Sequence, residues 1–526
     1  MGLIIPVKSN GISIIYGSPQ LQGTLSGKPV YTYEPGIECT EKDISRYLEG
    51  IDILHSLRSL VGFSKGLANP SESFIIIKGF PLTEEVLIDS AVSIIKYGKK
   101  GGEKFINDDG LLDLFKMVFK VNSNKLSSQH PFEIAFRIGY TQFNFQERPF
   151  NLLARNLYIY FHFWKKVSVA KHIDILADIQ EIIGIPYDLA IFFALALVGN
   201  KQGYVFPYSE ETLIKITEAT SIKIDADAHN RFLQWCSADY EFYKSYGKVL
   251  PSFIAQPIVN TKEYPKAGEA SAHLIISYNG MFQKVTSGIY YALIDKYNLG
   301  GKKNEFKRVF GYVFQEYVGE LLKYSLNGWS IIPEIKYKNG KNFVDSIDWF
   351  VQKEDKLILV EVKQSSVFLD AKYVSKMEDI SKDLDKTLVT AVKQLVKTHA
   401  AITSKKHPEF ELFREVKHFQ SLIVVYDPIY NGNNIVKKII KKSFGPVSIS
   451  YGLIGISDFE VLLDNQMDSG SLFELLEYKQ IDKKEFDFKE FTISMYPDGN
   501  KGMRFLKHYY ESFFDNVDKF SREIKE

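Results

Sequence analysis

The feature that most constrains this chain is a short apolar run, LILV at residues 357–360, that ends in two charged residues. Four consecutive apolar residues predict a central strand with both faces buried. Glu361 and Lys363 follow two positions apart, and residues two apart share one face of a strand. Charges at the end of a buried strand need partners or a metal ion. The run therefore predicts a layered domain with a polar site at one edge of its sheet.

A predicted hairpin brings a second acid to the same place. Residues 346–352 and 357–363 have the composition of two strands joined by the polar turn 353–356. Counting outward from this turn predicts the facing pairs Lys353–Lys356, Phe350–Leu359, Trp349–Val360 and Asp348–Glu361. A slip of one residue would turn Asp348 to the other face, so the register decides whether the two acids meet.

Two facing carboxylates repel each other unless a positive charge lies between them. Mg²⁺ or Mn²⁺ suits this place, because hard cations prefer oxygen ligands. Such a cation lowers the pKa of a bound water and neutralises phosphate oxygens, which phosphodiester hydrolysis requires. Lys363 would add a positive charge beside the attacking water or the transition state. The Glu-x-Lys triplet also begins at six other glutamates, so only its context separates this site from a solvated surface hairpin.

The elements around the hairpin follow a regular order. Apolar spacing predicts a helix over 305–324, a strand over 329–337, a helix over 384–402 and a buried strand over 419–426. The predicted order is helix, strand, strand, strand, helix, strand. This order is typical of an α/β layer arrangement.

Residues 344–351 (VDSIDWFV) and 357–364 (LILVEVKQ) resemble the PD-(D/E)xK, or restriction-endonuclease-like, nuclease superfamily. The resemblance covers about residues 305–426. It implies a restriction-endonuclease-like core and a metal-dependent DNA endonuclease that uses Mg²⁺ or Mn²⁺. It also implies that Asp348, Glu361 and the backbone carbonyl of Val362 bind the metal, and that Lys363 is the catalytic lysine. The leading Pro-Asp of the family is absent, because Ile347 precedes Asp348.

Other polar residues are candidates for the same site. Asp345 is an alternative metal ligand, but it lies an odd number of residues from Asp348, so an ideal strand puts them on opposite faces. Many nucleases of this kind carry a glutamate on the preceding helix, a role that Glu316 or its neighbour Glu320 could fill. Each could instead lie on a solvated helix flank. Three further sets are candidates for catalysis or substrate contact, namely Gln364, Gln394, and the basic groups Lys302, Lys303, Lys307, Arg308 and Lys437, Lys438, Lys441, Lys442.

Composition sets limits on location and partners. The 526 residues carry a net charge of +1, so nucleic-acid contacts must come from local basic patches. Two cysteines give no zinc or disulfide pattern, and a reducing compartment fits best. The longest apolar run, 189–198, is about half of a membrane span and predicts a buried helix. No secretory signal is visible, and we expect a soluble, cytoplasmic protein without membrane contact.

The chain divides into three predicted parts. Residues 1–285 form a mixed, largely helical α+β domain for sensing, recruitment or oligomerisation, residues 300–470 the nuclease domain, and residues 471–526 a helical tail. DNA rather than RNA is the expected partner, and cutting both strands of a duplex favours a homo-oligomer or larger complex. The extra domain suggests antiviral defence or restriction by analogy alone. One alternative is a nuclease-like fold that binds nucleic acid or assembles without catalysis. A second alternative is an interaction protein with an ordinary α/β edge.

Overall fold

The structure is a computed structural model of the chain. It describes residues 20–25, 28–32, 39–67, 75–127, 149–199, 204–205, 210–220, 224–225, 227–245, 249–261, 273–298, 303–364, 384–429, 437, 440–442, 444–445, 447, 449–466, 472–481, 488, 504–509, 511, 513 and 515. The basic residues Lys302 and Lys438 lie outside the described residues.

The chain forms two compact units rather than a linear series of domains. Unit 1 comprises Met1–Asn156, Asp174–Lys302 and Tyr509–Glu526, and unit 2 comprises Leu157–Ile173 and Lys303–His508. The longer segment of unit 2 begins at Lys303, within the Gly/Lys-rich sequence LGGKKN at residues 299–304. The division at 285, 300 and 470 differs in two places, because residues 157–173 belong to unit 2 and most of the expected tail does too.

Aromatic packing explains why the segment 157–173 joins unit 2. The indole of Trp164 stacks on the ring of Phe306, with centroids 6.0 Å apart. The ring of Tyr158 lies 5.9 Å from that of Tyr317. Phe306 and Tyr317 are buried residues of the first α-helix of unit 2. A distant segment therefore covers this helix, and nothing in the local sequence pattern indicates that contact.

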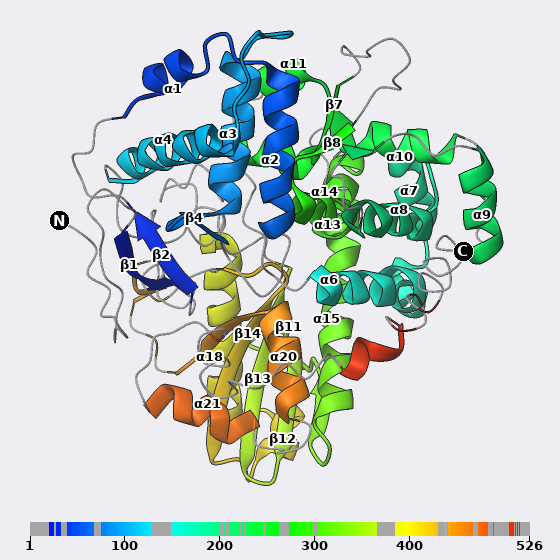
Figure 1. The fold of residues 1–526 in the computed structure, drawn as a ribbon. Coiled ribbons are helices and arrows are strands. Elements are labelled where there is room, and N and C mark those ends of the chain that lie inside the picture. Colours follow the sequence, from blue (N-terminus) through cyan, green and yellow to red (C-terminus); the bar gives the residue numbers. More distant parts are fainter. Residues whose placement is uncertain are drawn as a thin grey trace. The chain divides into compact units, whose positions relative to one another are not determined.

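Unit 2 is built around a five-stranded sheet (Figure 1). Its strands lie in the order β15 (Gly452–Gly455), β14 (His418–Val425), β13 (Lys356–Lys363), β12 (Trp349–Lys353) and β9 (Ser330–Pro333). The pairs β9–β12 and β12–β13 are antiparallel. The pairs β13–β14 and β14–β15 are parallel. The sheet is mixed, and unit 2 has α/β architecture.

The central strand β13 is buried along most of its length, as its LILV run predicts. Antiparallel β12 and parallel β14 satisfy its backbone on both sides. On one face Trp349 packs against α15 (Glu305–Ser325), where it meets Gly319. On the other face the ring of Phe350 lies 4.7 Å from that of Phe413, in the 3₁₀ helix Pro408–Phe413. Both faces of the sheet are therefore covered.

The first α-helix of unit 2, α15, begins where the sequence provides a cap. In α15, the Asn304 side chain accepts a hydrogen bond from the backbone N–H of Lys307 at 2.9 Å. This cap follows the Gly/Lys break. Further helices of unit 2 are a π-helix at Leu157–Phe163, 3₁₀ helices at Trp164–Lys166 and Ser168–Ala170, a π-helical turn at Asp385–Val389, α18 (Thr390–Thr403), α20 (Ile456–Gln466) and α21 (Leu472–Ile481). Residues 504–509 of the expected C-terminal helix are also helical.

One expected strand is wrong as a single element. Residues 329–337 are divided between β9, which ends at Pro333, and β10 (Lys336–Asn339), which pairs with β11 (Asn342–Asp345) as a separate hairpin. Proline has no N–H for a strand ladder, so it is suited to the end of a strand. The tip of the new hairpin contains Gly340 at φ 64°, a left-handed conformation that glycine adopts easily.

Unit 1 is mainly helical. Its helices are α1 (Glu41–Tyr47), α2 (Ile53–Leu67), α3 (Glu84–Tyr97), α4 (Asp108–Ser127), α6 (Pro149–Asn156), α7 (Ile175–Ile183), α8 (Tyr187–Gly199), α9 (Glu210–Thr220), α10 (Ala228–Cys236), α11 (Tyr240–Ser245), α12 (Val249–Ala255), α13 (Tyr278–Val285) and α14 (Ser287–Lys296). Its short strands are β1 (Gln20–Leu25), β2 (Lys28–Thr32), β3 (Ile75–Ile77), β4 (Phe80–Leu82), β5 (Tyr204–Val205), β6 (Ser237–Ala238), β7 (Ile258–Asn260) and β8 (His273–Ile275). They form two hairpins, β1–β2 and β3–β4, and a sheet in the order β5-β8-β7-β6.

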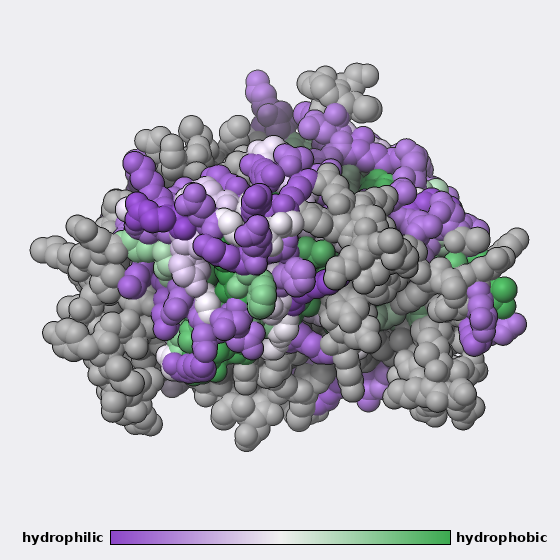
Figure 2. All heavy atoms as spheres, turned by 45° about the horizontal axis from the view of Figure 1, so that its top comes forward, coloured by the Kyte–Doolittle hydropathy of each residue, from purple (hydrophilic) through white to green (hydrophobic). Residues whose placement is uncertain are grey.

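The apolar run at 189–198 lies in α8, which is apolar on all sides and mostly buried. Among the described residues, no single helix has the length and hydropathy needed to cross a bilayer; α7 and α8 reach them only as a pair bent by 49°. In Figure 2, hydrophilic residues cover most of the described surface on one face, and hydrophobic residues show in smaller areas between them.

Candidate active site

The hairpin of β12 and β13 has the register that the sequence predicts. Trp349 pairs with Val360, Phe350 with Leu359, and Lys353 with Lys356, so these expected pairs are confirmed. The ladder ends at Trp349, and Asp348 is the next residue outward. There its Oδ2 accepts a hydrogen bond of 2.6 Å from the backbone N–H of Val362. This bond holds the Asp348 carboxylate beside the end of β13, where Glu361 lies.

Both acids are buried, and their pKa values reflect it. Glu361 is 0% exposed and Asp348 is 8% exposed. Burial, and then the negative charge of Asp348, raise the pKa of Glu361 to about 8. Burial also raises the pKa of Asp348, while the charge of Lys363 and the Val362 N–H oppose the rise. Two carboxylates that each disfavour the other's charge form a place where a cation is strongly stabilised.

Lys363 supplies one positive charge at this place. Its ammonium group contacts Glu361 Oε1 and donates a hydrogen bond of 3.0 Å to Gln394 Oε1 on α18. The side chain is 21% exposed, so the ammonium group is held by the protein and still reached by solvent. Gln394 is therefore a partner of Lys363 rather than an unrelated surface amide.

The helix α15 contributes Glu316, another acidic side chain, to the surroundings of Asp348. Glu316 is half-buried, and its charge helps to raise the pKa of Asp348. Burial in turn raises the pKa of Glu316 itself. The neighbouring Glu320 forms an ion pair of 3.2 Å with Lys323 on the helix surface. Of the two helical glutamates, Glu316 is the one that acts on the acidic pair.

Two other candidates, Asp345 and Gln364, have surroundings that differ from those of the acidic pair. Asp345 is 54% exposed in β11 and lies 3.8 Å from the ammonium group of Lys336. Gln364 follows β13, and alternation along the strand turns it to the face opposite Lys363. Its amide lies beside Gly311 of α15. Substrate contact by Gln364 and metal binding by the Val362 carbonyl stay predictions.

Sequence reasoning missed Glu334 as a neighbour of Asp348. Pro333, the last residue of β9, pairs with Trp349, so Glu334, the residue that follows the strand, lies beside Asp348. Burial of its carboxylate and the charges of Asp345 and Asp348 raise the pKa of Glu334 to about 7. Local sequence could not reveal this, because it depends on the pairing of β9 with β12. Once the pair Pro333–Trp349 is known, counting one residue outward places Glu334 opposite Asp348.

The basic groups expected near the site are only partly described. The guanidinium of Arg308 makes two hydrogen bonds, of 3.0 and 2.6 Å, to Glu305 on the same helix. Lys437, Lys441 and Lys442 lie in the described part of their cluster. Groove lining by these residues stays a prediction.

The carboxylate oxygens of Asp348 and Glu361 are suitable ligands for a hard divalent cation. Glu361 Oε2 is buried and has no hydrogen-bond partner among the described residues. Within that part of the chain, no group of three or more His, Cys, Asp and Glu side chains is arranged to hold a metal by itself. Magnesium sites commonly use one or two carboxylates together with water and substrate phosphates. Asp348 and Glu361 fit that kind of site.

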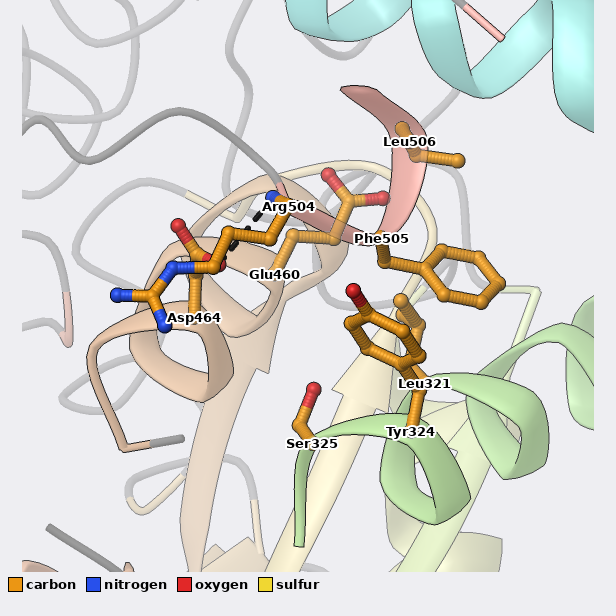
Figure 3. Close-up of a pocket in the computed structure, with 8 residues that line it drawn as sticks. All are labelled: Leu321, Tyr324, Ser325, Glu460, Asp464, Arg504, Phe505 and Leu506. Atoms are coloured by element: carbon orange, nitrogen blue, oxygen red, sulfur yellow. Dashed lines mark hydrogen bonds and ion pairs between the residues drawn. The ribbon is translucent and has the colours of Figure 1, made fainter. Parts of the chain in front are cut away.

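A hollow elsewhere in unit 2 is distinct from the acidic pair (Figure 3). It is lined by Leu321, Tyr324, Ser325, Glu460, Asp464, Arg504, Phe505 and Leu506. The buried Asp464 accepts a hydrogen bond of 3.2 Å from the backbone N–H of Arg504, whose Nε lies 3.7 Å from the same oxygen. The cavity volume of this hollow is about 10 Å³, which leaves room for about one water molecule. We interpret the hollow as the place where residues 504–506 pack against α15 and α20.

Comparisons with known proteins add little to this geometry. The chain matches no protein-family model, and no curated protein matches it. Among solved structures, the small subunit of the heterodimeric restriction endonuclease R.BspD6I is similar to 43% of this chain and 98% of its own, at 12% identity and a TM-score of 0.18. A similarity with so low a TM-score defines neither fold nor function, so both have to be argued from strand order and side-chain positions.

Proposed function

We propose that this chain is a metal-dependent nuclease that hydrolyses phosphodiester bonds, with DNA as the preferred substrate. The observation that carries the proposal is the buried oxygen Glu361 Oε2, which has no hydrogen-bond partner among the described residues and lies beside Asp348 and Lys363. A buried carboxylate oxygen without a partner is costly, and a bound cation would remove that cost. The likeness of residues 344–364 to PD-(D/E)xK nucleases supports the same chemistry.

In this proposal Asp348, Glu361 and the Val362 carbonyl hold Mg²⁺ or Mn²⁺. When bound, such a cation supplies a water of lowered pKa and neutralises charge on the phosphate. The Val362 N–H keeps the Asp348 carboxylate turned toward this position. Gln394 keeps the ammonium group of Lys363 beside Glu361, where it can meet a phosphate oxygen. Glu316 adds negative charge on the α15 side, which favours cation binding.

Assembly and biological role follow as further parts of the proposal. One site of this kind cuts one strand, so cutting a duplex favours a homo-oligomer or a larger complex. Unit 1 would serve sensing, recruitment or oligomerisation, and a role in antiviral defence or restriction rests on analogy.

Metal-dependent cleavage by matched variants tests the function. Plasmid and linear DNA are incubated with the whole protein in Mg²⁺, in Mn²⁺ and in EDTA. Lys363→Ala and Glu361→Gln should each lower the cleavage rate at least about 100-fold, the scale for losing one preorganised group. Lys417→Ala and Glu415→Gln are the controls, because both residues are exposed in the turn before β14. They should cut like the unaltered protein.

The outcomes separate the proposal from its alternatives. Cleavage that survives EDTA, or that Lys363→Ala and Glu361→Gln retain, would contradict the nuclease site. DNA binding without cleavage under all conditions would favour the non-catalytic nucleic-acid-binding alternative. Neither binding nor cleavage would favour an interaction protein.

A further inference from the structure

The hairpin of β10 and β11 leaves the sheet at the acidic pair. It begins three residues after β9 ends, and it ends three residues before Asp348. At its root the backbone N–H of Ser346 donates to the Ile335 carbonyl at 3.0 Å, and the Ile335 N–H donates to Ser346 Oγ at 2.8 Å. Ser346 is fully buried. The hairpin is therefore fixed to the edge of the sheet that carries Asp348.

One face of this hairpin is fastened to the body of unit 2. Tyr337 is buried, and its ring lies 5.0 Å from that of Phe410 and 5.3 Å from that of His407. The backbone N–H of Lys338 donates to Glu409 Oε1 at 3.4 Å. These contacts come from the 3₁₀ helix Pro408–Phe413 and the residue before it. We call the hairpin of β10 and β11 the arm. These contacts hold the arm in place on this side.

The opposite face carries an exposed aromatic ring, two lysines and one acid. Lys338 pairs with Phe343 across the two strands, and Lys336 lies on the same face, two residues from Lys338. Asp345 pairs with Lys336 on this face and lies 3.8 Å from its ammonium group, so Lys338 and the tip supply the positive charge that remains. Phe343 is 71% exposed and the Lys336 side chain is 74% exposed. Lys341 adds a further exposed positive charge at the tip. A bare ring among ammonium groups suits a ligand with flat faces and negative charges.

We propose that this face of the hairpin binds a DNA strand next to the site of cleavage. The lysines contact phosphates, and the ring of Phe343 stacks on a base that is unpaired or unstacked. This inference rests on the proposed nuclease function and names how the substrate is held. Stacking of bases on aromatic side chains together with basic groups is the general way in which proteins hold single strands.

The reach of the hairpin suits this role. At about 3.3 Å per residue, the six steps from Glu334 to Gly340 extend about 20 Å from the acidic edge. A DNA strand advances about 3.4 Å per nucleotide, so roughly six nucleotides would run along the arm. Phe343, three residues back from the tip, would meet a base near the middle of that stretch.

Equilibrium binding tests the arm without relying on cleavage. Fluorescence anisotropy is measured in EDTA with a labelled duplex, with the same duplex containing an unpaired stretch, and with the RNA counterpart of that stretch. Phe343→Ala should weaken binding to the DNA with unpaired bases by roughly 5- to 100-fold. Phe105→Ala is the matched control, since Phe105 is 70% exposed and lies in unit 1. It should bind like the unaltered protein.

Salt dependence tests the lysines separately. The double variant Lys338→Ala/Lys341→Ala should make the slope of log affinity against log salt less steep by up to about 2, close to one per lost phosphate contact. The control is Lys353→Ala/Lys417→Ala, which removes two lysines at the opposite end of the sheet. Its slope should stay unchanged.

The two proposals fail in distinguishable ways. If the protein cuts DNA but Phe343→Ala and the lysine variant bind like the controls, the arm is overturned and the nuclease stands. If no cleavage occurs but both variants lose binding, the arm stands and the nuclease falls. Tighter binding of the RNA would overturn the choice of DNA, and absence of any binding would overturn the arm.

Discussion

Two glycines of α15 should respond oppositely to the same substitution. A Cβ added at Gly319 would lie 2.5 Å from Cη2 and 2.6 Å from Cε2 of Trp349, and closer still to Cζ2. A Cβ added at Gly311 would meet only the side-chain oxygen of Gln364, at 3.4 Å. Gly319 thus admits the indole by lacking a side chain, whereas Gly311 has room.

The sizes of two opposing effects, helix propensity and overpacking, decide whether each substitution stabilises or destabilises the protein. Replacing glycine by alanine inside a helix stabilises by about 1 kcal/mol through propensity. Overpacking a buried site costs about 1–3 kcal/mol, occasionally more. Trp349 cannot easily move, because it is 2% exposed and its Nε1 donates to the Gln315 carbonyl at 2.9 Å. The close approach to three ring atoms puts the overpacking cost at Gly319 at the upper end of this range, and propensity offsets about 1 kcal/mol of it. We therefore expect Gly319→Ala to destabilise unit 2 by about 2 kcal/mol, and Gly311→Ala to be neutral or stabilising by up to about 1 kcal/mol.

Urea unfolding followed by tryptophan fluorescence measures both variants. Three of the four tryptophans, Trp164, Trp329 and Trp349, belong to unit 2, so its transition dominates the signal. The midpoint should fall for Gly319→Ala and hold or rise for Gly311→Ala. An equal or higher midpoint for Gly319→Ala would refute the packing argument. Equal losses in both variants would mean that the helix needs its glycines for another reason.

Three other predictions follow from buried polar groups. Burial raises the pKa of Glu84 to about 7, so the folded state holds a proton that the unfolded state releases near its ordinary pKa. The free energy of unfolding should therefore fall by up to about 3 kcal/mol as pH rises from about 4.5 through 7, and Glu84→Gln should flatten this slope in urea titrations at several pH values. Tyr317 donates a 2.6 Å hydrogen bond to the buried Glu460, so Tyr317→Phe should destabilise by about 1–3 kcal/mol in the same assay, and an unchanged midpoint would show the bond to be dispensable. Added Mg²⁺ or Mn²⁺ should raise the unfolding temperature and EDTA reverse the rise, and a rise that persists in Asp348→Asn and Glu361→Gln would place the cation elsewhere.

Sequence alone determined the local geometry around the acidic pair. The polar turn at 353–356 and the period of two along each strand were enough to place Trp349 opposite Val360, since a short turn leaves few registers. The LILV run correctly indicated a strand buried on both faces, because that much apolar surface cannot be left in water. These features depend on residues that are neighbours in the chain.

Only the tertiary structure decided which distant residues surround that pair. Glu334 approaches Asp348 through the pairing of β9 with β12, and Gln394 reaches Lys363 from α18. Residues 157–173 join unit 2 through ring contacts with a helix more than a hundred residues away. Such contacts form because folding buries apolar surface wherever shapes fit, and no spacing in the sequence encodes that choice. The sequence therefore predicted the pair of acids and the lysine, while packing selected their neighbours.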